Sequence, residues 1–130
     1  ECWAVTAPKE TVNKRDGSVV TVRRSKILLF VFHRPSDNVK GQVAFTGGYP
    51  FAKGRSIALD LDGVIYDLTA DGEWAWPPSP ADDEKIIASM KRGAKAVVTA
   101  QSERGTVTKD TFSLTGFTAA VKAAEKRCAG

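Results

Sequence analysis

The sequence predicts a mainly β protein, an antiparallel β-sandwich or barrel-like domain with one helix in mid-chain and one at the C-terminal end. Three observations support this prediction. Short segments alternate apolar and polar residues, which is typical of half-buried strands. Asp-Gly pairs at Asp16–Gly17 and Asp62–Gly63 fit two-residue hairpin turns. Apolar residues follow helical spacing around 80–92 and 116–127.

Length and composition limit the possible architectures. With 130 residues, of which 42% are hydrophobic, the chain is expected to form a single domain, 1–130, with an ordinary core. It has no run of about 18 apolar residues, so we expect no transmembrane segment. The net charge is +4 and the pI about 9.2, but the basic residues are scattered and Arg23–Lys26 is the one dense group. We therefore expect no nucleic-acid partner.

Strands are expected throughout the first third of the chain. Cys2–Val5 is a short apolar strand. The segment 12–22 is a hairpin around the first Asp-Gly pair, in which Val20 and Val22 share the buried face. Ile27–Phe32 is apolar on both faces, which predicts a central strand that is covered on both sides.

A fourth segment is expected to pair with this apolar strand. His33 follows the apolar run without an obvious catalytic partner, so we interpret it as structural. Gln42–Thr46 alternates, with Val43 and Phe45 inward, and is predicted to pair antiparallel with the preceding strand. Gly47–Phe51 is a tight connection, because its two glycines permit positive φ and its proline lacks a backbone donor.

The segment 56–68 admits two incompatible interpretations. In the first, Asp62–Gly63 forms a type I′ turn between two antiparallel strands. This turn fixes the register and puts six apolar residues on one face, which is what a half-buried hairpin needs. The predicted cross-strand pairs are Leu61 with Val64, Leu59 with Tyr66 and Ile57 with Leu68.

In the second interpretation, Asp60–Val64 resembles the nucleophile motif of Mg²⁺-dependent haloacid-dehalogenase phosphatases. Asp60 would attack phosphorus, Asp62 would act as acid and base, and both would help to hold the metal. Such a site needs a buried parallel strand before Asp60 and a helix soon after the motif. The alternation on both sides of the turn fits neither requirement. We therefore favour the hairpin and predict no catalytic residue, no metal site and no cofactor.

The segment Asp71–Ser79 is expected to be a loop and is rich in aromatic residues and proline. Trp74 and Trp76 would share a face if this segment were extended. They would then either cap the core or form an exposed aromatic platform for a partner, together with Tyr49. These three residues are the candidate partner-binding residues.

The segment 80–92 has the pattern of a helix. Ser79 suits the N-cap and Pro80 suits the first helical position. Acidic residues follow at the positive end of the helix dipole, so Asp82 and Asp83 are interpreted as helix-start residues and not as a metal-binding pair. The apolar side of this helix consists of Ile86, Ile87 and Met90.

Two strands and a helix complete the chain. Lys95–Ala100 and Thr106–Phe112 are predicted to pair across a turn at 102–105. The segment 116–127 is predicted to be a helix with one buried stripe. The members of that stripe are Phe117, Ala120, Val121, Ala124 and Cys128.

The two cysteines, Cys2 and Cys128, stand at opposite ends of the chain. Because the termini of compact domains often lie close together, we expect a disulfide between them, with two free thiols as the alternative. A disulfide implies an oxidising compartment. The sequence starts at Glu1 without Met and without an apolar leader, which is consistent with a mature secreted protein after removal of a signal peptide.

Three stretches carry a family resemblance: Phe45–Phe51, Glu73–Pro77 and Asp110–Ala120. The third contains the element Leu114–Thr118, which leads into the terminal helix. Together they resemble the invasion-associated locus B family, and the resemblance covers nearly the whole chain.

This resemblance implies a compact β-rich fold with no established enzymatic activity and no cofactor. Family members are small exported bacterial proteins of the periplasm or the outer-membrane fraction, and some are linked to host-cell invasion and virulence. The pathogen members carry additional internal cysteines, whereas this chain has two in all. From the family resemblance we expect a non-enzymatic exported protein that serves as a binding or envelope-associated module. Its partner would be an envelope or host component, and it would be a monomer or a weak homo-oligomer.

Overall fold

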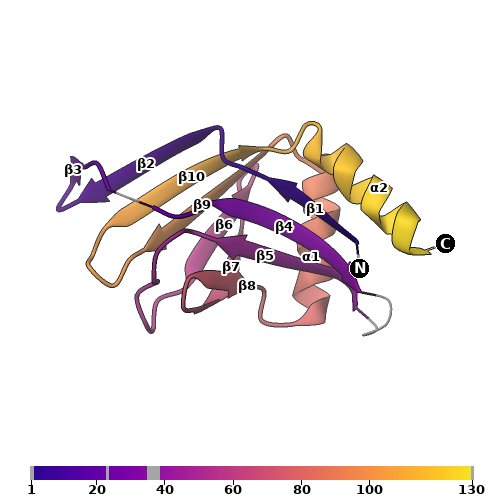
Figure 1. The fold of residues 1–130 in the computed structure, drawn as a ribbon, viewed down its shortest axis with the longest axis horizontal. Coiled ribbons are helices and arrows are strands. Elements are labelled where there is room, and N and C mark those ends of the chain that lie inside the picture. Colours follow the sequence, from indigo (N-terminus) through magenta and orange to yellow (C-terminus); the bar gives the residue numbers. More distant parts are fainter. Residues whose placement is uncertain (1, 23, 35–38, 130) are drawn as a thin grey trace.

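The structure, a computed structural model, describes residues 2–22, 24–34 and 39–129. Within these residues, ten strands form one antiparallel sheet in the order β1-β4-β5-β8-β7-β6-β9-β10-β2-β3 (Figure 1). The strands are β1 (Cys2–Thr6), β2 (Glu10–Arg15), β3 (Ser18–Val19), β4 (Leu28–Arg34), β5 (Val39–Thr46), β6 (Ile57–Leu61), β7 (Val64–Asp71), β8 (Trp74–Trp76), β9 (Lys95–Gln101) and β10 (Val107–Ser113). The helices are α1 (Pro80–Arg92) and α2 (Phe117–Ala129). The prediction of a mainly antiparallel β fold with two helices is confirmed.

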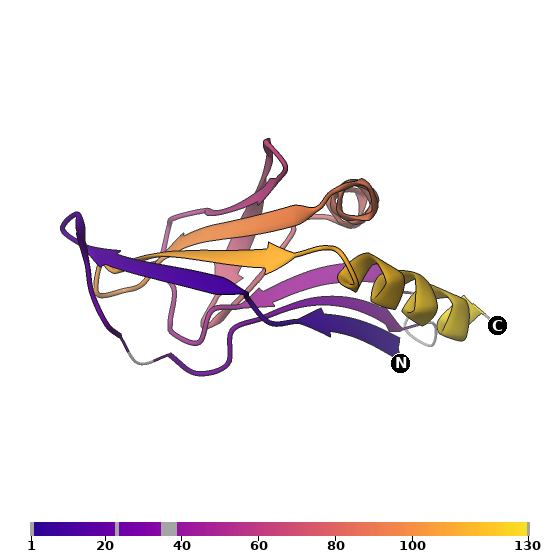
Figure 2. The same cartoon turned by 90° about the horizontal axis from the view of Figure 1, so that it is seen from above.

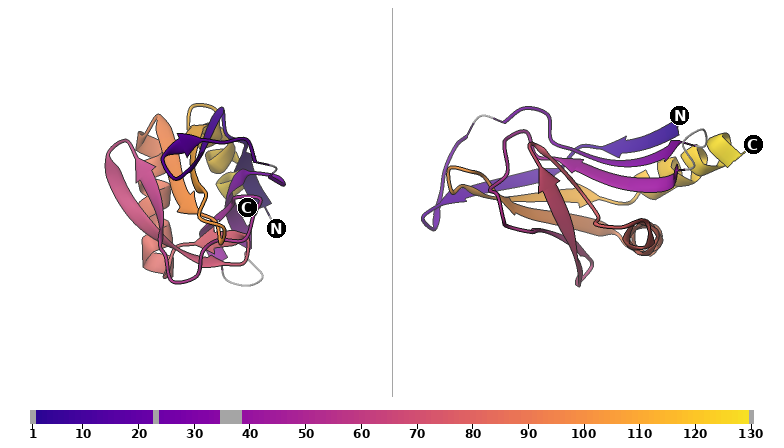
Figure 3. Two further views of the ribbon diagram at one scale, coloured as in Figure 1. Left: turned by 90° about the vertical axis from the view of Figure 1, so that its left-hand side faces the viewer. Right: turned by 90° about the horizontal axis from the view of Figure 1, so that it is seen from below.

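The sheet curls because strand β7 takes part in both of its halves. Residues Val64–Leu68 pair with β6, whereas Thr69–Asp71 pair with β8. Viewed end-on, the strands curl around a shared interior (Figure 3). Helix α2 packs against β1 and β4, and helix α1 packs against β5 (Figures 1 and 2). Both chain ends consequently lie at the same end of the molecule (Figure 1).

Side chains from both halves of the sheet fill the interior. Phe45 of β5 meets Phe112 of β10 edge-on, with 6.1 Å between the ring centroids. Burial of such rings is the main favourable term in the folding of a domain of this size. The largest fully buried side chains are Phe45, Phe112, Leu29, Ile57, Leu59, Leu68, Ile86, Met90, Leu114, Val31, Val43 and Val98.

The hairpin predicted at 57–68 is confirmed in its register. Leu61 pairs with Val64, Leu59 with Tyr66 and Ile57 with Leu68. Asp62 (φ 51°) and Gly63 (φ 98°) both adopt positive φ, as a type I′ turn requires. Val64 differs from the expectation, because it is 54% exposed at the tip of the hairpin.

The predicted helices are also confirmed. Ser79 caps α1, since its hydroxyl accepts a hydrogen bond from the backbone N–H of Asp82 at 3.3 Å, and Pro80 is the first helical residue. Helix α2 buries Phe117, Val121 and Ala124. Ala120, expected in the same stripe, is exposed, because it lies on the flank of the helix that borders a surface hollow.

The structure corrects the prediction for the second half of the first hairpin. Val20 and Val22 were expected to continue a strand, but β3 ends at Val19. The backbone N–H of Val20 still bonds to the carbonyl of Asn13 at 2.9 Å. The chain then leaves the sheet and carries Arg24 across to strand β10, where it pairs with an aspartate.

The apolar segment Ile27–Phe32 also differs from the expectation of a central strand that is covered on both sides. Strand β4 is second from one end of the sheet. Leu29 and Val31 are fully buried, whereas Phe30 and Phe32 on the other face are half-buried. The reason is that the apolar stripe of α2 joins the interior, so that this helix covers the inner face alone.

Candidate partner-binding face

One face of the sheet carries aromatic side chains that neither described helix covers. Side chains alternate along a strand, so Trp3 and Val5 of β1 point outward while Ala4 between them is buried. The cross-strand partner of Trp3 is Phe32 of β4, and the partner of Val5 is Phe30. Paired residues share a face of a sheet, so these four apolar side chains form one outward patch.

Strand β8 extends this patch across the sheet. Ala75 is fully buried, so Trp74 and Trp76 on either side of it point outward. Trp74 pairs with Thr46 of β5, and its ring lies 5.7 Å from that of Phe30. The segment expected to be a loop is therefore a short strand, because β5 and β7 both supply it with hydrogen-bonding partners. We call the outward apolar set the aromatic face: Trp3, Val5, Leu28, Phe30, Phe32, Trp74 and Trp76.

The aromatic face exposes much of its apolar surface to water. Trp3 is 54%, Val5 43% and Trp74 38% exposed. Phe30 and Phe32 are half-buried and stack on each other with 5.0 Å between centroids. Large contiguous apolar patches are rare on soluble monomers, and those that are exposed are often interaction surfaces.

Charged residues lie beside the aromatic face and within it. At the β1 end, Lys126 and Arg127 of helix α2 line a hollow of about 640 Å³ beside Trp3. At the β8 end, the exposed side chain of Asp71 is the cross-strand partner of Trp74. Within the face itself, the guanidinium carbon of Arg34 lies 5.0 Å from the ring centroid of Phe32.

The structure places Tyr49, the third candidate residue, in a different pocket of about 600 Å³. Its hydroxyl forms a hydrogen bond with Thr108 of β10, and the guanidinium carbon of Arg24 lies 5.1 Å from its ring centroid. Burial raises the pKa of Tyr49, although the hydrogen bond and the nearby cation oppose this effect. Trp74 and Trp76 therefore share a surface, and Tyr49 does not join them.

A buried ion pair next to Tyr49 connects the two halves of the sheet. The Nη1 and Nη2 atoms of Arg24 donate to the two carboxylate oxygens of Asp110, each at 2.7 Å. The Nε of Arg24 donates to the carbonyl of Gly47 at 2.9 Å. The two side chains are 5% and 0% exposed. This bidentate geometry satisfies both charges and ties the end of β5 to β10.

The two carboxylates of the hairpin turn bond to the backbone. Asp60 accepts a hydrogen bond from the N–H of Gly63 at 2.7 Å, and Asp62 accepts one from the N–H of Ala94 at 2.8 Å. Both neighbours of β6, strands β7 and β9, are antiparallel to it. This arrangement contradicts the parallel strand that the phosphatase hypothesis requires. The described residues include no cluster of three or more His, Cys, Asp or Glu placed to hold a metal ion.

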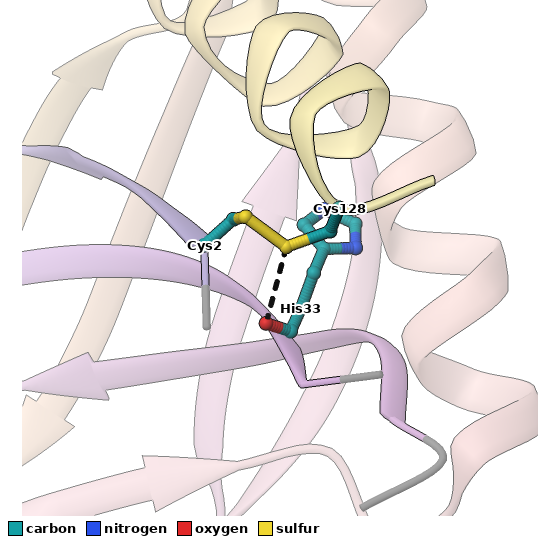
Figure 4. Close-up of a disulfide and its surroundings, with 3 residues drawn as sticks. All are labelled: Cys2, His33 and Cys128. Atoms are coloured by element: carbon teal, nitrogen blue, oxygen red, sulfur yellow. Dashed lines mark hydrogen bonds between the residues drawn. A yellow bond between two sulfur atoms is a disulfide. The ribbon is translucent and has the colours of Figure 1, made fainter. Parts of the chain in front are cut away.

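The predicted disulfide is present between Cys2 and Cys128 (Figure 4). It joins β1 to the last turn of α2 across a Cα–Cα distance of 6.1 Å. The Sγ of Cys128 lies 3.8 Å from the carbonyl oxygen of His33 on the neighbouring strand β4. The bridge therefore fastens α2 directly behind the part of the sheet that carries the aromatic face.

Sequence reasoning found the two tryptophans of β8 but missed Trp3, Phe30 and Phe32. The apolar run of β4 was the available signal for these residues. A single core covers one face of such a strand, so its other apolar face has to point outward. Assigning Phe30 and Phe32 to the outside requires the pairing of β4 with β1 and β5, which the sequence does not state.

Comparison with known proteins gives a family match. Residues 2–125 match the family model described as "Invasion associated locus B (IalB) protein", in agreement with the resemblance carried by the sequence. Searches of curated proteins and of solved structures find no match to the chain. Neither helix among the described residues is long and apolar enough to cross a membrane.

Proposed function

The chain belongs to the invasion associated locus B (IalB) family, and from this membership and the aromatic face we propose that it is a non-enzymatic exported binding module. Its partner would be a component of the bacterial envelope or of a host. The single observation that carries the proposal is the exposed apolar surface formed by Trp3, Val5 and Trp74.

The composition of the aromatic face supports a binding role. Tryptophan and phenylalanine are enriched in the buried centres of protein interfaces, where they contribute most of the binding energy. The stacking of Phe30 on Phe32 and the contact of Phe30 with Trp74 hold three rings together before any partner arrives. Little side-chain entropy then remains to be lost on binding.

The disulfide supports a location outside the cytoplasm. Disulfides persist in oxidising compartments such as the periplasm and the extracellular space. The bridge between Cys2 and Cys128 spans almost the entire chain, at a sequence separation of 126. We therefore propose a periplasmic, outer-membrane-associated or secreted location for the protein.

Site-specific photocrosslinking in bacterial cells tests the proposed binding role. A benzophenone amino acid is introduced in place of Trp74, and in a second variant in place of Trp3. The matched control is the same substitution at Val19, which is 73% exposed on β3, far from the aromatic face. We expect crosslinked products from positions 3 and 74 and none from position 19. Absence of products from both face positions would contradict the proposal.

A further inference from the structure

We propose that the outer edge of strand β1 binds an extended acidic peptide segment of the partner, which adds to the sheet as a further strand. This inference rests on the proposed function, because it states how the binding module holds its partner. Strand β1 stands at one end of the strand order, and among the described residues it pairs with β4 alone. In an antiparallel ladder, every second residue directs both its N–H and its C=O away from the neighbouring strand. These groups of β1 can therefore pair with an added strand.

The sequence of β1 contains none of the features that usually protect an edge strand from pairing. Edge strands are commonly very short, or they carry charged residues or proline. Residues Cys2–Thr6 include no charged residue, no proline and no glycine, and the side chains of Trp3 and Val5 are exposed. The strand at the opposite end of the sheet, β3, has only two residues. The longer apolar edge of β1 is thus the one that favours pairing with another chain.

The hollow of about 640 Å³ between β1 and α2 gives an added strand room at this edge. Trp3 points to the outer side of the sheet and α2 packs on the inner side, so a hollow that both of them line reaches around the edge of β1 (Figure 1). Its lining residues on α2 extend over about 10 Å of the helix, the length of about three strand residues. The full lining is Cys2, Trp3, Ala120, Ala123, Ala124, Lys126 and Arg127. The disulfide from Cys2 to Cys128 fixes the distance between the strand and the helix.

The charges in this hollow select an acidic segment. Lys126 and Arg127 are both exposed, and the residues that line the hollow include no acidic side chain. No carboxylate among the described residues forms a salt bridge with either of them. The neighbouring carboxylate of Glu125 is engaged with Lys91 of α1, at 2.6 Å. An acidic side chain of the added strand would therefore gain two cationic neighbours.

The place of the added strand also determines its sequence pattern. Side chains alternate along a strand, so those on its outer side extend the aromatic face beside Trp3 and Val5. Those on its inner side lie over the alanines and cations of α2. The segment should therefore alternate apolar and acidic residues. The β1 strand of a second copy does not fit, because Cys2–Thr6 has no acidic residue and would leave both cations without a counter-charge.

Calorimetric titration of the purified, disulfide-bonded chain with synthetic peptides tests this proposal. The probe is a peptide of about eight residues that alternates valine and glutamate, with both ends blocked. We expect a dissociation constant between about 10 μM and 1 mM, as for other small, transient interfaces. The matched peptide of valine and lysine should bind about tenfold or more weakly, because its charges meet Lys126 and Arg127.

N-methylated peptides test the backbone pairing. One version of the glutamate peptide is methylated on the amides of its valines, and the other on the amides of its glutamates. Methylation removes a hydrogen-bond donor, and only every second amide of an added strand points toward β1. One version should therefore lose binding about tenfold or more, and the other should retain it.

Variants of α2 test the position of the peptide. Lys126→Glu with Arg127→Glu should reverse the preference, so that the lysine peptide binds more tightly than the glutamate peptide. Ala123→Tyr should weaken binding about tenfold or more, because the added ring occupies the hollow. Ala119→Tyr, at an exposed position of α2 outside the hollow, is the matched control and should leave binding unchanged. Far-UV circular dichroism verifies that each variant folds.

Three results would overturn the proposal for the β1 edge. The first is a glutamate peptide that does not bind at concentrations up to about 1 mM. The second is equal binding of the two methylated peptides, which would exclude backbone pairing. The third is a peptide-free chain that sediments as a dimer, because a second copy would then occupy the edge. In each case, photocrosslinks from position 74 to another protein would leave the proposed binding function intact.

Discussion

Asp83 is a carboxylate in a place where its charge is costly. It is 7% exposed, at the start of α1, and it accepts a hydrogen bond from the backbone N–H of Val43 at 2.8 Å. This bond fastens the helix to strand β5. Burial raises the pKa of Asp83 from 3.8 to about 6, because loss of water outweighs the hydrogen bond that favours the ionised form.

Replacement of Asp83 by Asn should change how stability depends on pH. The folded pKa of Asp83 lies above the unfolded value, so the folded protein binds more protons between pH 3.8 and about 6. Its contribution to the free energy of unfolding is therefore greatest below that window and falls as pH rises through it. Asp83→Asn keeps the acceptor for Val43 but cannot ionise, so it should stabilise the protein at pH 7 by about 1–3 kcal/mol.

Urea unfolding at pH 4, 6 and 7.5 measures this effect. The exposed Asp67→Asn variant is the control and should follow the wild-type pH profile. An Asp83→Asn profile parallel to that of the wild type would show that the carboxylate remains hydrated in the folded protein.

The Arg24–Asp110 ion pair leads to a second prediction for single residues. Asp110→Ala should destabilise the protein by about 3–5 kcal/mol, because it leaves a buried guanidinium without its counter-ion. The double change Arg24→Met with Asp110→Leu should cost less than the single change, since no buried charge then remains unpaired. Equilibrium unfolding in urea compares the two variants. A double variant less stable than Asp110→Ala would mean that the charges themselves hold the curled sheet closed.

The structure of the β6–β7 hairpin is determined by its own sequence and could be predicted without knowledge of contacts to distant segments. The alternation runs in phase on both arms, and the turn residues Asp62 and Gly63 accept positive φ. Gly63→Ala should therefore cost about 1 kcal/mol or more, purely through backbone strain, because an added Cβ meets no heavy atom within 4 Å. Gly63→Asn should cost less, since Asn tolerates this conformation. Thermal unfolding distinguishes the two variants, and equal losses would point to a steric cause instead.

Strand β8 shows why other elements could not be predicted in the same way. Trp74–Trp76 is too short for a recognisable alternation, and Pro77 and Pro78 follow it directly. The segment is extended because β5 and β7 provide hydrogen-bonding partners on its two sides. Its strand character is thus a tertiary property, and so is the outward direction of its two indoles.

For the whole molecule, the features that depend on local interactions could be predicted from the sequence, and those that depend on contacts between distant segments could not. Turn chemistry, helix capping and periodicity act over a few residues, and they correctly predicted the β6–β7 hairpin, both helices and the β9–β10 pair. Strand order depends on contacts between distant segments, such as β1 with β4 and β10 with β2. The aromatic face depends on that order, which is why only Trp74 and Trp76 were found beforehand.

The disulfide leads to a prediction for the whole molecule. The bond between Cys2 and Cys128 closes a loop with a sequence separation of 126, so it restricts nearly the entire unfolded chain. Its removal should lower the free energy of unfolding by about 4–5 kcal/mol in the chain-entropy model. In the folded protein the same bond holds α2 against β1, so the helix should loosen before the rest of the sheet.

Urea unfolding with and without reductant measures the global loss, and the double variant Cys2→Ala with Cys128→Ala should reproduce it. Hydrogen exchange resolved by residue measures the local effect. We expect amides of α2 (Phe117–Ala129) to lose protection in the reduced protein, while amides of β6 and β9, at the centre of the sheet, retain theirs. Uniform loss of protection across both regions would mean that the bond acts only through the unfolded state, and that packing of Phe117 and Val121 alone is enough to hold the helix in place.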